Sequence, residues 1–388
     1  MNAPKLRFKE FNDEWISQKL FQLVEFSKGN ILAKADLDET GNYPCILYGQ
    51  LYTKYNEVIR EVYSKTNRNE NNIPKSKKGD VLIPSSGETP IDISTSSCIQ
   101  IDNVLLGGDI NILRPISCDG RFLSYLINNN KKTEIAKVAQ GHSVVHLYND
   151  NLKQISINIP SVQEQKRISD TLELLDKKIE LQSKKIEDLK LFKLYMENQF
   201  IFKDDASYIE YKLRDILIEG NKTPVVDTNK YQKLTIKLNL KGLEFNESQK
   251  EMSDKRPFYV RDENELIIGK QNYFNGSIAI INKKYAGGIC SNAIMSFKAK
   301  DGFDIKYIYL YLSQKSYMKQ REFLANGTGQ KELSEKEFLN FSIRIPSDNK
   351  VKKIIKNVNC ISKKILLEEN KLNKLIELKR GLMQSMFV

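Results

Sequence analysis

The stretch Ile157-Asn158-Ile159-Pro160-Ser161 decides the fold, because the chain contains it twice. It returns as Ile343-Arg344-Ile345-Pro346-Ser347, at an offset of 186 residues. The same offset carries Gly141 onto Gly327. Self-similarity at a fixed offset is the sequence signature of a duplicated architecture. The sequence therefore predicts two related halves, each a variable domain followed by a matching tail.

Apolar residues in each tail recur with spacings that alternate between four and three residues. A repeat of about 3.5 residues over more than four heptads is typical of a coiled-coil seam. We therefore expect two long helices that pair with each other, rather than two helices that each pack only on their own domain. The seam residues are Ile168, Leu172, Leu175, Ile179, Ile186, Leu189, Met196 and Phe200, then Ile354, Val358, Ile361, Ile365, Leu372, Leu375, Leu382 and Met386, with Gln182, Lys193, Glu368 and Lys379 in the gaps.

The polar residues in the seam indicate the direction of pairing. In a parallel, in-register pair Lys193 would face Lys379, and this buried contact between like charges would cost stability. Parallel pairing would also require residues 203–346 to carry the chain back along the whole first helix. We predict an antiparallel pair, with one variable domain at each end and an approximate two-fold axis across the middle. From Ile168 to Phe200 the helix would rise about 48 Å, at ~1.5 Å per residue.

The two variable domains have the pattern of mixed α/β structure, with strand-like runs punctuated by glycine and proline. The expected fold class is α/β (α+β), with two such domains joined by two long helices in an antiparallel coiled coil and a pseudo-two-fold internal repeat. The domains would span residues 1–160 and 203–346, and the helical spacers residues 161–202 and 347–388. Expected strands are Tyr43–Tyr48, Asp80–Ile83, Asp109–Leu113, Leu234–Leu238, Glu265–Ile268 and Ser277–Ile281, with helices near Arg121–Lys132 and Ile305–Leu324.

The composition of the 388 residues excludes membrane and secreted classes and favours a cytoplasmic protein. No apolar run approaches the ~18–20 residues of a membrane span, and the first ten residues lack the apolar core of a signal peptide. Five scattered cysteines without a Cys-x-x-Cys pair are typical of reduced thiols. The net charge of +12 fits a nucleic-acid partner, and it equally fits an ordinary lysine-rich surface.

Catalytic motifs are missing from the chain, so we expect it to bind rather than to react. It has no phosphate-binding loop, no dinucleotide-binding glycine fingerprint and no Asn-Pro-Pro-Tyr tetrapeptide of an amino-methyltransferase. His142 and His146 have the spacing of helical metal ligands, but Gly141 precedes them, so a polar loop is the favoured interpretation. No pair of carboxylates stands out for acid–base catalysis. An enzyme with a dispersed active site is the least favoured hypothesis.

Several motifs resemble the specificity subunit of type I restriction–modification systems, and the resemblance covers essentially the whole chain. The Pro-x-x-x-Glu-Gln opening of the first helix is the most specific of them. The second copy departs from it, because Lys350-Val351 stands where Glu164-Gln165 stands in the first. We therefore do not expect both helix starts to make the same contacts. The matching segments are Phe26–Gly29, Ile46–Tyr52, Gly79–Ile83, Ile159–Gln165 and Ile267–Gly276.

The resemblance implies a DNA-binding specificity subunit that acts in phage defence. Each domain would recognise one half of a split, asymmetric target in double-stranded DNA. The helices would set the gap and dock two methyltransferase (modification) subunits. Those partners would use S-adenosylmethionine to methylate adenine, and restriction/translocase subunits would use ATP and Mg²⁺. This chain would hold no cofactor or metal and would be non-catalytic. The alternative is a coiled-coil scaffold whose end domains bind protein or RNA.

Polar side chains that follow strands are the candidates for reading bases, because loops there can reach the groove edges of a duplex. Asparagine and glutamine suit adenine, lysine suits guanine, and tyrosine can stack or bind phosphate. A solvated loop is the competing interpretation at each position. The candidates are Tyr48, Gln50, Ser85, Ser86 and Thr89 in the first domain, and Lys270, Gln271, Asn272 and Tyr273 in the second.

Glycine-containing loops related by the repeat are the candidates for holding phosphate. Exposed amides and hydroxyls near helix ends can bind a phosphate without reading sequence, although a simple helix C-cap explains the same glycines equally well. Two lysines early in their domains join this group. The candidates are Lys28, His142, Ser143, Lys222, Thr328, Gln330 and Lys331.

Overall fold

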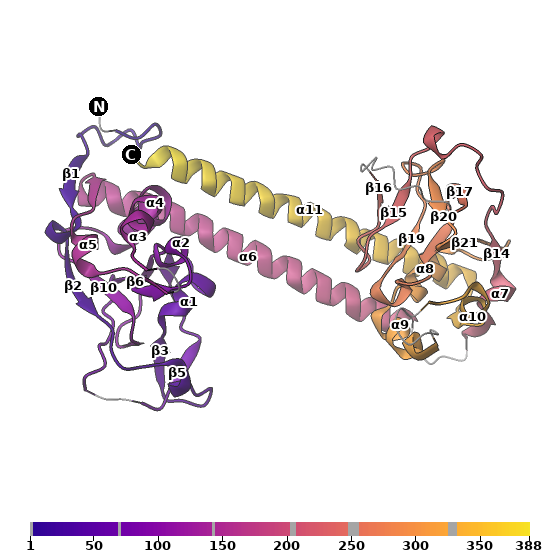
Figure 1. The fold of residues 1–388 in the computed structure, drawn as a ribbon, viewed down its shortest axis with the longest axis horizontal. Coiled ribbons are helices and arrows are strands. Elements are labelled where there is room, and N and C mark those ends of the chain that lie inside the picture. The colour runs from indigo at the N-terminus through magenta and orange to yellow at the C-terminus, as the bar shows by residue number, and fades with distance from the viewer. Residues whose placement is uncertain (1–2, 69–70, 142–143, 202–206, 247–255, 325–331) are drawn as a thin grey trace. The chain divides into compact units, whose positions relative to one another are not determined.

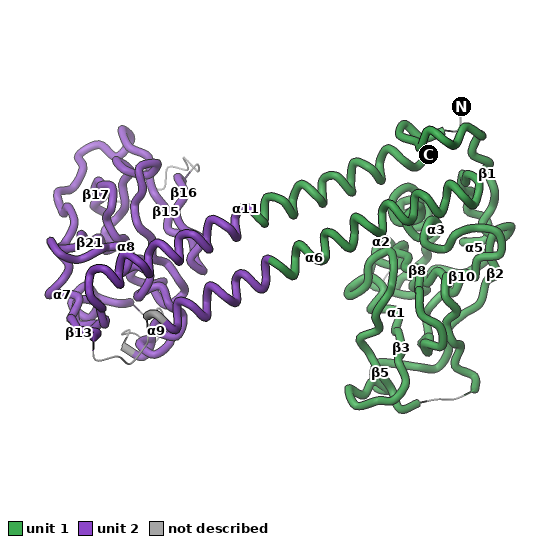
Figure 2. The backbone as a smooth tube through the Cα atoms, turned by 180° about the vertical axis from the view of Figure 1, so that it is seen from behind, with its two compact units in different colours: residues 1–185, 368–388 green, residues 186–367 purple. Residues whose placement is uncertain are grey.

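The computed structural model describes residues 3–68, 71–141, 144–201, 207–246, 256–324 and 332–388 (Figure 1). The chain forms two compact units, residues 1–185 with 368–388 and residues 186–367 (Figure 2). This division cuts both long helices, so each unit contains one variable domain and part of each helix.

The first unit is built on a five-stranded sheet and a smaller three-stranded one. The large sheet has the order β2 (Val24–Lys28), β10 (Ile110–Pro115), β6 (Val81–Pro84), β8 (Ser97–Ile99) and β4 (Val58–Ile59). The small sheet has the order β5 (Ser64–Thr66), β3 (Tyr43–Ile46) and β9 (Leu105–Leu106), and β7 (Ser86–Gly87) pairs with β11 (Val145–His146). Its helices are α1 (Tyr48–Thr53), α2 (Pro90–Ile93), α3 (Gly120–Leu126), α4 (Lys132–Val138) and α5 (Asn149–Lys153).

The second unit repeats this plan with a four-stranded sheet. Its order is β14 (Leu217–Glu219), β21 (Ile294–Ala299), β18 (Leu266–Gly269) and β19 (Ile278–Ile280). Two further ladders are β15 (Leu234–Ile236) with β16 (Leu243–Phe245), and β17 (Phe258–Val260) with β20 (Ile289–Ser291). Its helices are α7 (Leu213–Ile216), α8 (Ile305–Leu312), α9 (Lys315–Arg321) and α10 (Glu335–Leu339).

The internal repeat predicted from the sequence is confirmed in the sheets and in individual hydrogen bonds. In the first unit β10 lies between β2 and β6, and in the second β21 lies between β14 and β18. The backbone N–H of Leu147 donates to the carbonyl of Ser85 at 2.9 Å. The backbone N–H of Leu333 donates to the carbonyl of Lys270, also at 2.9 Å. Ser85 and Lys270 therefore occupy equivalent positions in the two domains.

The duplicated Ile-x-Ile-Pro-Ser motif joins the end of each domain to its beginning. Strand β12 (Ser156–Ile159) pairs antiparallel with β1 (Ile16–Lys19), and β22 (Ser342–Ile345) pairs with β13 (Ile209–Lys212). Ile157 and Ile343 are fully buried, as the alternation of a half-buried strand requires. The proline that follows has no N–H for the ladder, so the strand ends there and a helix begins.

The two long helices are α6 (Val162–Ile201) and α11 (Asp348–Met386). Every predicted seam residue with a described side chain is buried or half-buried, as a packed helix face requires. In the first unit Ile168 and Leu172, near the start of α6, pack into the same core as Met383 and Met386, at the end of α11. The helices are therefore antiparallel there, as predicted.

A polar layer interrupts the apolar seam in the first unit. The Gln182 amide donates to the carboxylate of Glu368 at 2.7 Å and to its backbone carbonyl at 2.9 Å. The ammonium group of Lys185 lies 2.9 Å from the other carboxylate oxygen. The hydrogen bond from Gln182, and then the contact with Lys185, lowers the pKa of Glu368 to about 2. A polar pair within an apolar seam fixes the register of the helices.

Lys379, a predicted seam residue of α11, connects this helix to the variable domain of the first unit. Lys379 lies 2.7 Å from Asp176 of α6 and 3.0 Å from Glu57 of the domain. The hydroxyl of Tyr125 donates to the same Asp176 carboxylate at 2.6 Å. The antiparallel pairing thus gives Lys379 two carboxylates, whereas a parallel pairing would have given it Lys193.

The starts of the two helices make different contacts, as the departure of the second motif copy predicts. The Glu164 carboxylate, 1% exposed, receives both hydrogen bonds of a bidentate pair with Arg7, each 2.8 Å long. Gln165 accepts from the Asp119 backbone N–H at 2.8 Å. At the equivalent positions, Lys350 lies over the Tyr208 ring and Val351 packs in the core of the second unit.

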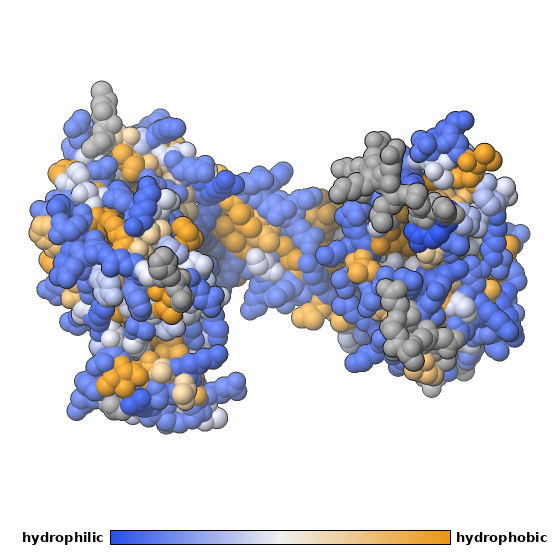
Figure 3. Space-filling model, in the orientation of Figure 1, coloured by the Kyte–Doolittle hydropathy of each residue, from blue (hydrophilic) through white to orange (hydrophobic). Residues whose placement is uncertain are grey.

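Apolar side chains also remain exposed on the helices away from the seam (Figure 3). Leu181 and Phe192 of α6 are 58% and 52% exposed. Their repeat equivalents on α11, Leu367 and Leu378, are 61% and 52% exposed. Positions 11 residues apart lie on the same face of an α-helix. Each helix therefore carries the same outward-facing apolar pair.

We predict that Glu368→Gln lowers the melting temperature at neutral pH, because Lys185 loses its charged partner. A carboxylate with a lowered pKa stabilises the fold above its unfolded pKa, near 4.5, and this contribution is lost as the pH falls toward 2. The difference in melting temperature between wild type and variant should therefore shrink between about pH 4.5 and pH 2. Thermal melts monitored by circular dichroism over this range measure it. Glu187→Gln, on the exposed side of α6, is the control and should show no such convergence.

Candidate nucleic-acid interface

In the second domain, three of the predicted base-reading residues lie together where β18 ends. Lys270, Gln271 and Asn272 line a cavity of 510 Å³, and the last two are exposed. Strand β18 is apolar and buried up to Ile268, so the chain reaches the surface only after Gly269. Residues of β15 also line the cavity, as do Lys233 and Arg256. Amide and cationic side chains thus converge on one concave surface.

Tyr273, the fourth predicted base-reading residue of this domain, is corrected to a core position. Its side chain is fully buried, and its hydroxyl donates to the Leu312 carbonyl at 2.9 Å. The ring packs edge-on against Phe338. Burial raises the pKa of Tyr273 well above its usual value. No part of this side chain is open to a base, because the short 3-10 helix Tyr273–Asn275 turns it inward.

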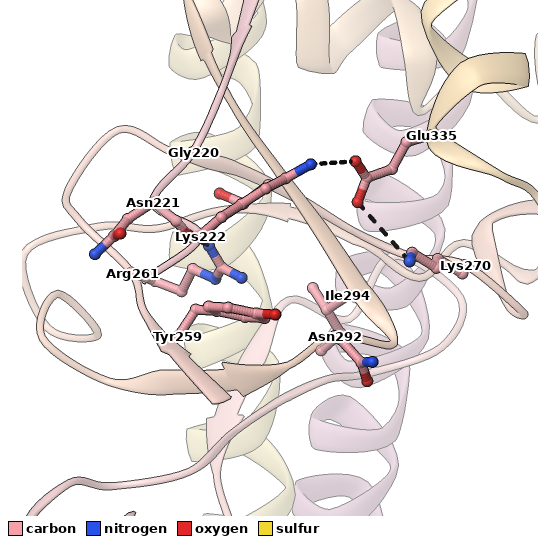
Figure 4. A pocket seen from close by; sticks show the side chains of 10 residues that line it. Gly220, Asn221, Lys222, Tyr259, Arg261, Lys270, Asn292, Ile294 and Glu335 are labelled. Atoms are coloured by element: carbon pink, nitrogen blue, oxygen red, sulfur yellow. Dashed lines mark hydrogen bonds and ion pairs between the residues drawn. The ribbon is translucent and has the colours of Figure 1, made fainter. Parts of the chain in front are cut away.

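A second, smaller cavity of 170 Å³ lies beside the first and shares Lys270 with it (Figure 4). The ammonium group of Lys222, predicted to hold phosphate, lies 2.7 Å from the Glu335 carboxylate and 2.8 Å from Glu219. Lys270 lies 3.8 Å from the other oxygen of Glu335. Hydrogen bonds to Glu219 and Glu335 raise the pKa of Lys222. Both predicted DNA-contacting lysines therefore share one carboxylate.

Arg261 is a cation in the wall of the smaller cavity that the sequence reasoning missed. It is only 3% exposed, and its guanidinium donates to the Asn221 carbonyl at 3.1 Å. The guanidinium lies over the Tyr259 ring, 5.3 Å from its centroid, and 3.9 Å from the Glu265 carboxylate. Arg261 directly follows β17, and this position after a strand is the same signal that selected Lys270.

Three of the predicted base-reading residues of the first domain are buried, and the structure corrects them to structural positions. Ser85 and Ser86 are each 4% exposed. Gln50 is 8% exposed, accepts from the Leu47 N–H at 3.0 Å and donates to Ser64. The Gln50 amide is used inside the domain, and the low exposure of Ser85 and Ser86 leaves these side chains little surface for a base.

The other two predicted residues of this domain, Tyr48 and Thr89, are not fully buried. Tyr48 is half-buried at the start of α1. Thr89 is exposed, and its hydroxyl oxygen accepts from the Asp92 N–H at 3.2 Å. Thr89 therefore caps the short helix α2, which is a local structural role.

Lys28, a predicted phosphate ligand, is exposed at the end of β2 in the first domain. Its ammonium group lies 5.6 Å from the centroid of the Tyr148 ring, and Tyr148 is 46% exposed. The Tyr148 ring in turn stacks near His146. A cation beside open aromatic rings suits the backbone and bases of a nucleic acid. Tyr148 was not selected from the sequence, and His146 was considered there only as a metal ligand.

Lys28 and Lys222 occupy related places in their domains. Lys28 is the last residue of β2, which pairs with β10. Lys222 lies just after β14, which pairs with β21. Each approaches the start of a short helix, where Tyr148 precedes α5 and Glu335 opens α10. The two domains thus present a lysine at the same edge, with an aromatic partner in one and a carboxylate partner in the other.

The remaining predicted phosphate ligands lie outside the described residues; they are His142, Ser143, Thr328, Gln330 and Lys331. All five cysteines are free thiols. Among the residues with described positions, no group of three His, Cys, Asp or Glu side chains could hold a metal ion. In the same part of the chain, no helix has the length and apolar character to cross a membrane.

Curated relatives are similar to the chain over different lengths. A type I restriction enzyme specificity subunit of Haemophilus influenzae is 29% identical over 190 residues, which is 44% of this chain and 45% of the relative. The type I restriction enzyme MjaX specificity subunit of Methanocaldococcus jannaschii is 23% identical over 411 aligned positions, covering 98% of this chain and 95% of the relative.

Solved structures share the fold over nearly the full length. The type I restriction–modification S subunit from M. genitalium superposes with a TM-score of 0.66 at 16% identity and covers 100% of this chain and 99% of its own. A chain from a structure of type I R–M system assembly gives 0.53 at 12% identity, covering 96% and 97%.

The family comparison matches two segments that correspond to the two halves of the repeat. Residues 12–191 and 207–378 each match the type I restriction modification DNA specificity domain. Together these segments cover most of the chain, and each contains one variable domain with most of the helix that follows it. The chain therefore belongs to the family of type I restriction modification DNA specificity domains.

Proposed function

We propose that the chain is the DNA-specificity subunit of a type I restriction–modification complex, with each domain recognising one half of a split target. The observation that carries this proposal is the pair of specificity domains with the same sheet order but different side chains at equivalent positions. Lys270-Gln271-Asn272 in the second domain stands where Ser85-Ser86-Gly87 stands in the first. Only the second domain has exposed amides at this position, so the two domains do not read bases with the same groups, and the target is asymmetric.

The cavity that Gln271 and Asn272 line is the proposed base-reading surface of the second domain. Both side chains are exposed and carry amides, which can form bidentate hydrogen bonds with adenine in the major groove. Lys233 and Arg256, which line the same cavity, are suited to the phosphates that flank the bases.

The paired helices are the proposed ruler and docking surface. Leu181 and Phe192 are repeated as Leu367 and Leu378, and all four are exposed. Exposed apolar residues off the seam are typical of a protein interface. A surface that occurs twice suits two copies of one partner, and we propose the two methyltransferase subunits. S-adenosylmethionine, ATP and Mg²⁺ then belong to the modification and restriction/translocase subunits, and this chain contributes specificity rather than catalysis.

Mapping modified adenines in the genome of the source strain tests the proposed function. The expected result is a split, non-palindromic motif that disappears when this gene is deleted and returns with the wild-type gene. A modification pattern that does not depend on the gene would contradict the proposal and favour the scaffold alternative.

We predict that removal of one heptad from both helices shortens the gap between the half-sites. Ser183–Leu189 follows Gln182 and Ile361–Leu367 precedes Glu368, so the deletion removes matched segments and Lys185 but keeps the Gln182–Glu368 hydrogen bond. The domains should approach by about 10 Å, or about 3 base pairs, with both half-sites unchanged. The modified motif in cells measures the gap. Deleting Ser183–Leu189 alone leaves the seam mismatched and should abolish modification. An unchanged gap in the double deletion would refute the ruler role.

We predict that Gln271→Ala weakens binding to the matched half-site by roughly 1–3 kcal/mol and relaxes preference at one base position. The physical reason is the loss of amide hydrogen bonds to a base edge. Binding of the assembled complex to duplexes with single-base changes measures both effects. Gln320→Ala, which truncates an exposed glutamine on α9 that does not line the cavity, is the control and should bind like wild type. Equal weakening of every duplex by Gln271→Ala would mean that this residue contacts phosphate instead.

A further inference from the structure

The smaller cavity of the second domain is lined by three cations from three separate segments of the chain. Lys222 follows β14, Arg261 follows β17, and Lys270 follows β18. Figure 4 shows all three side chains around the same space, with Glu335 between the two lysines. The cavity measures 170 Å³ and is also lined by Asn221 and Asn292. Lysine and arginine side chains are the usual ligands of a phosphate group.

Arg261 supplies an independent indication that the cavity is built for an anion. Its side chain is 97% buried, and among the described residues its Nε has no hydrogen-bond partner. The guanidinium reaches a carboxylate, that of Glu265, only at 3.9 Å. A buried guanidinium group with an unused N–H costs stability unless another acceptor satisfies it. Arg261 lines the cavity, so an anion bound there is a candidate acceptor for its guanidinium.

Glu335 is the resident anion at this cavity, and the first domain has no charge at the equivalent position. Lys222 and Lys270 contact its two oxygens at 2.7 and 3.8 Å. The 186-residue offset places Asn149 at the corresponding start of α5. There Lys28 lies over the ring of Tyr148 and, among the described residues, makes no ion pair. The carboxylate is therefore a feature of the second domain and not a requirement of the shared fold.

We propose that the cavity of Lys222, Arg261 and Lys270 binds a backbone phosphate of DNA, and that Glu335 is the counterion which this phosphate displaces. The inference rests on the proposed function and adds a site to it. Glu335 is 28% exposed, so its carboxylate can turn outward when a phosphate takes its place. The competition lowers the affinity of the second domain for every sequence, and Lys270 contacts phosphate rather than guanine.

The test measures binding of the full chain, assembled with its methyltransferase subunits, to a random-sequence duplex at several salt concentrations. Glu335→Gln keeps the size of the side chain and removes its charge, so affinity at low salt should rise roughly 3- to 10-fold. Lys222→Gln should lower affinity and reduce the salt slope by about one. A duplex series with neutral methylphosphonates at single positions should contain one position at which the Glu335→Gln gain disappears.

Asp301→Asn is the control for the charge change. Asp301 is exposed in the same domain and follows the last residue of β21, Ala299. The cavity is lined by the first residue of this strand, Ile294. If Glu335→Gln gains no more affinity than Asp301→Asn, or if its gain persists at every methylphosphonate position, the phosphate site is wrong. If the wild-type complex fails to bind duplex DNA at all, the proposed function itself fails. Circular dichroism melts confirm that each variant is folded.

Discussion

Each variable domain ends beside its own beginning, and the rest of the architecture depends on this closure. The last strand of each domain lies along the first, with Ile16 opposite Ile159 and Ile209 opposite Ile345. The long helix therefore leaves the domain at the point where the chain entered it. The loops that follow the central strands β6 and β18 are not part of the β1–β12 and β13–β22 pairs that form this junction. They are free to differ between the domains, while the sheet and the helix start stay the same.

The periodic features of the molecule could be predicted from the sequence, because a physical repeat produces them. The seam follows from apolar residues at a fixed spacing, and Gln182, Lys193, Glu368 and Lys379 fall in the gaps of that spacing. Antiparallel pairing follows from the charge of the two lysines. The strands around Ile83 and Ile268 were recognisable because they are short apolar runs bounded by glycine and proline.

The direction in which a polar side chain points could not be predicted in the same way. Ser85, Ser86 and Gln50 follow strands and carry hydrogen-bonding groups, but they face inward. Tyr273 directly follows two exposed residues and is fully buried, because one turn of 3-10 helix reverses its side. Residue type reports hydrogen-bonding capacity, and the tertiary structure decides whether the partner is the protein or the solvent. Arg261 was missed for the same reason, because the sequence does not show that this buried charged residue lines a cavity.

The two domains have diverged most where the structure leaves side chains free to contact a ligand. At equivalent edges, one domain has Lys28 with an aromatic ring and the other has Lys222 with a carboxylate. The aromatic partner leaves the charge of its lysine uncancelled, whereas the carboxylate offsets it. The same fold therefore presents surfaces of different electrostatic strength at its two duplicated positions.

The polar layer of the seam has a consequence for which helices can pair. Gln182 and Glu368 are the same position in the two halves of the repeat, and they contact each other. Two copies of α11 paired in this register would bring Glu368 against Glu368, and the repulsion between two buried carboxylates would oppose that pairing. Two copies of α6 would lose the charged acceptor that holds both Gln182 and Lys185. A symmetric pair of like helices is thus disfavoured, and the helix that follows one domain is selective for the helix that follows the other.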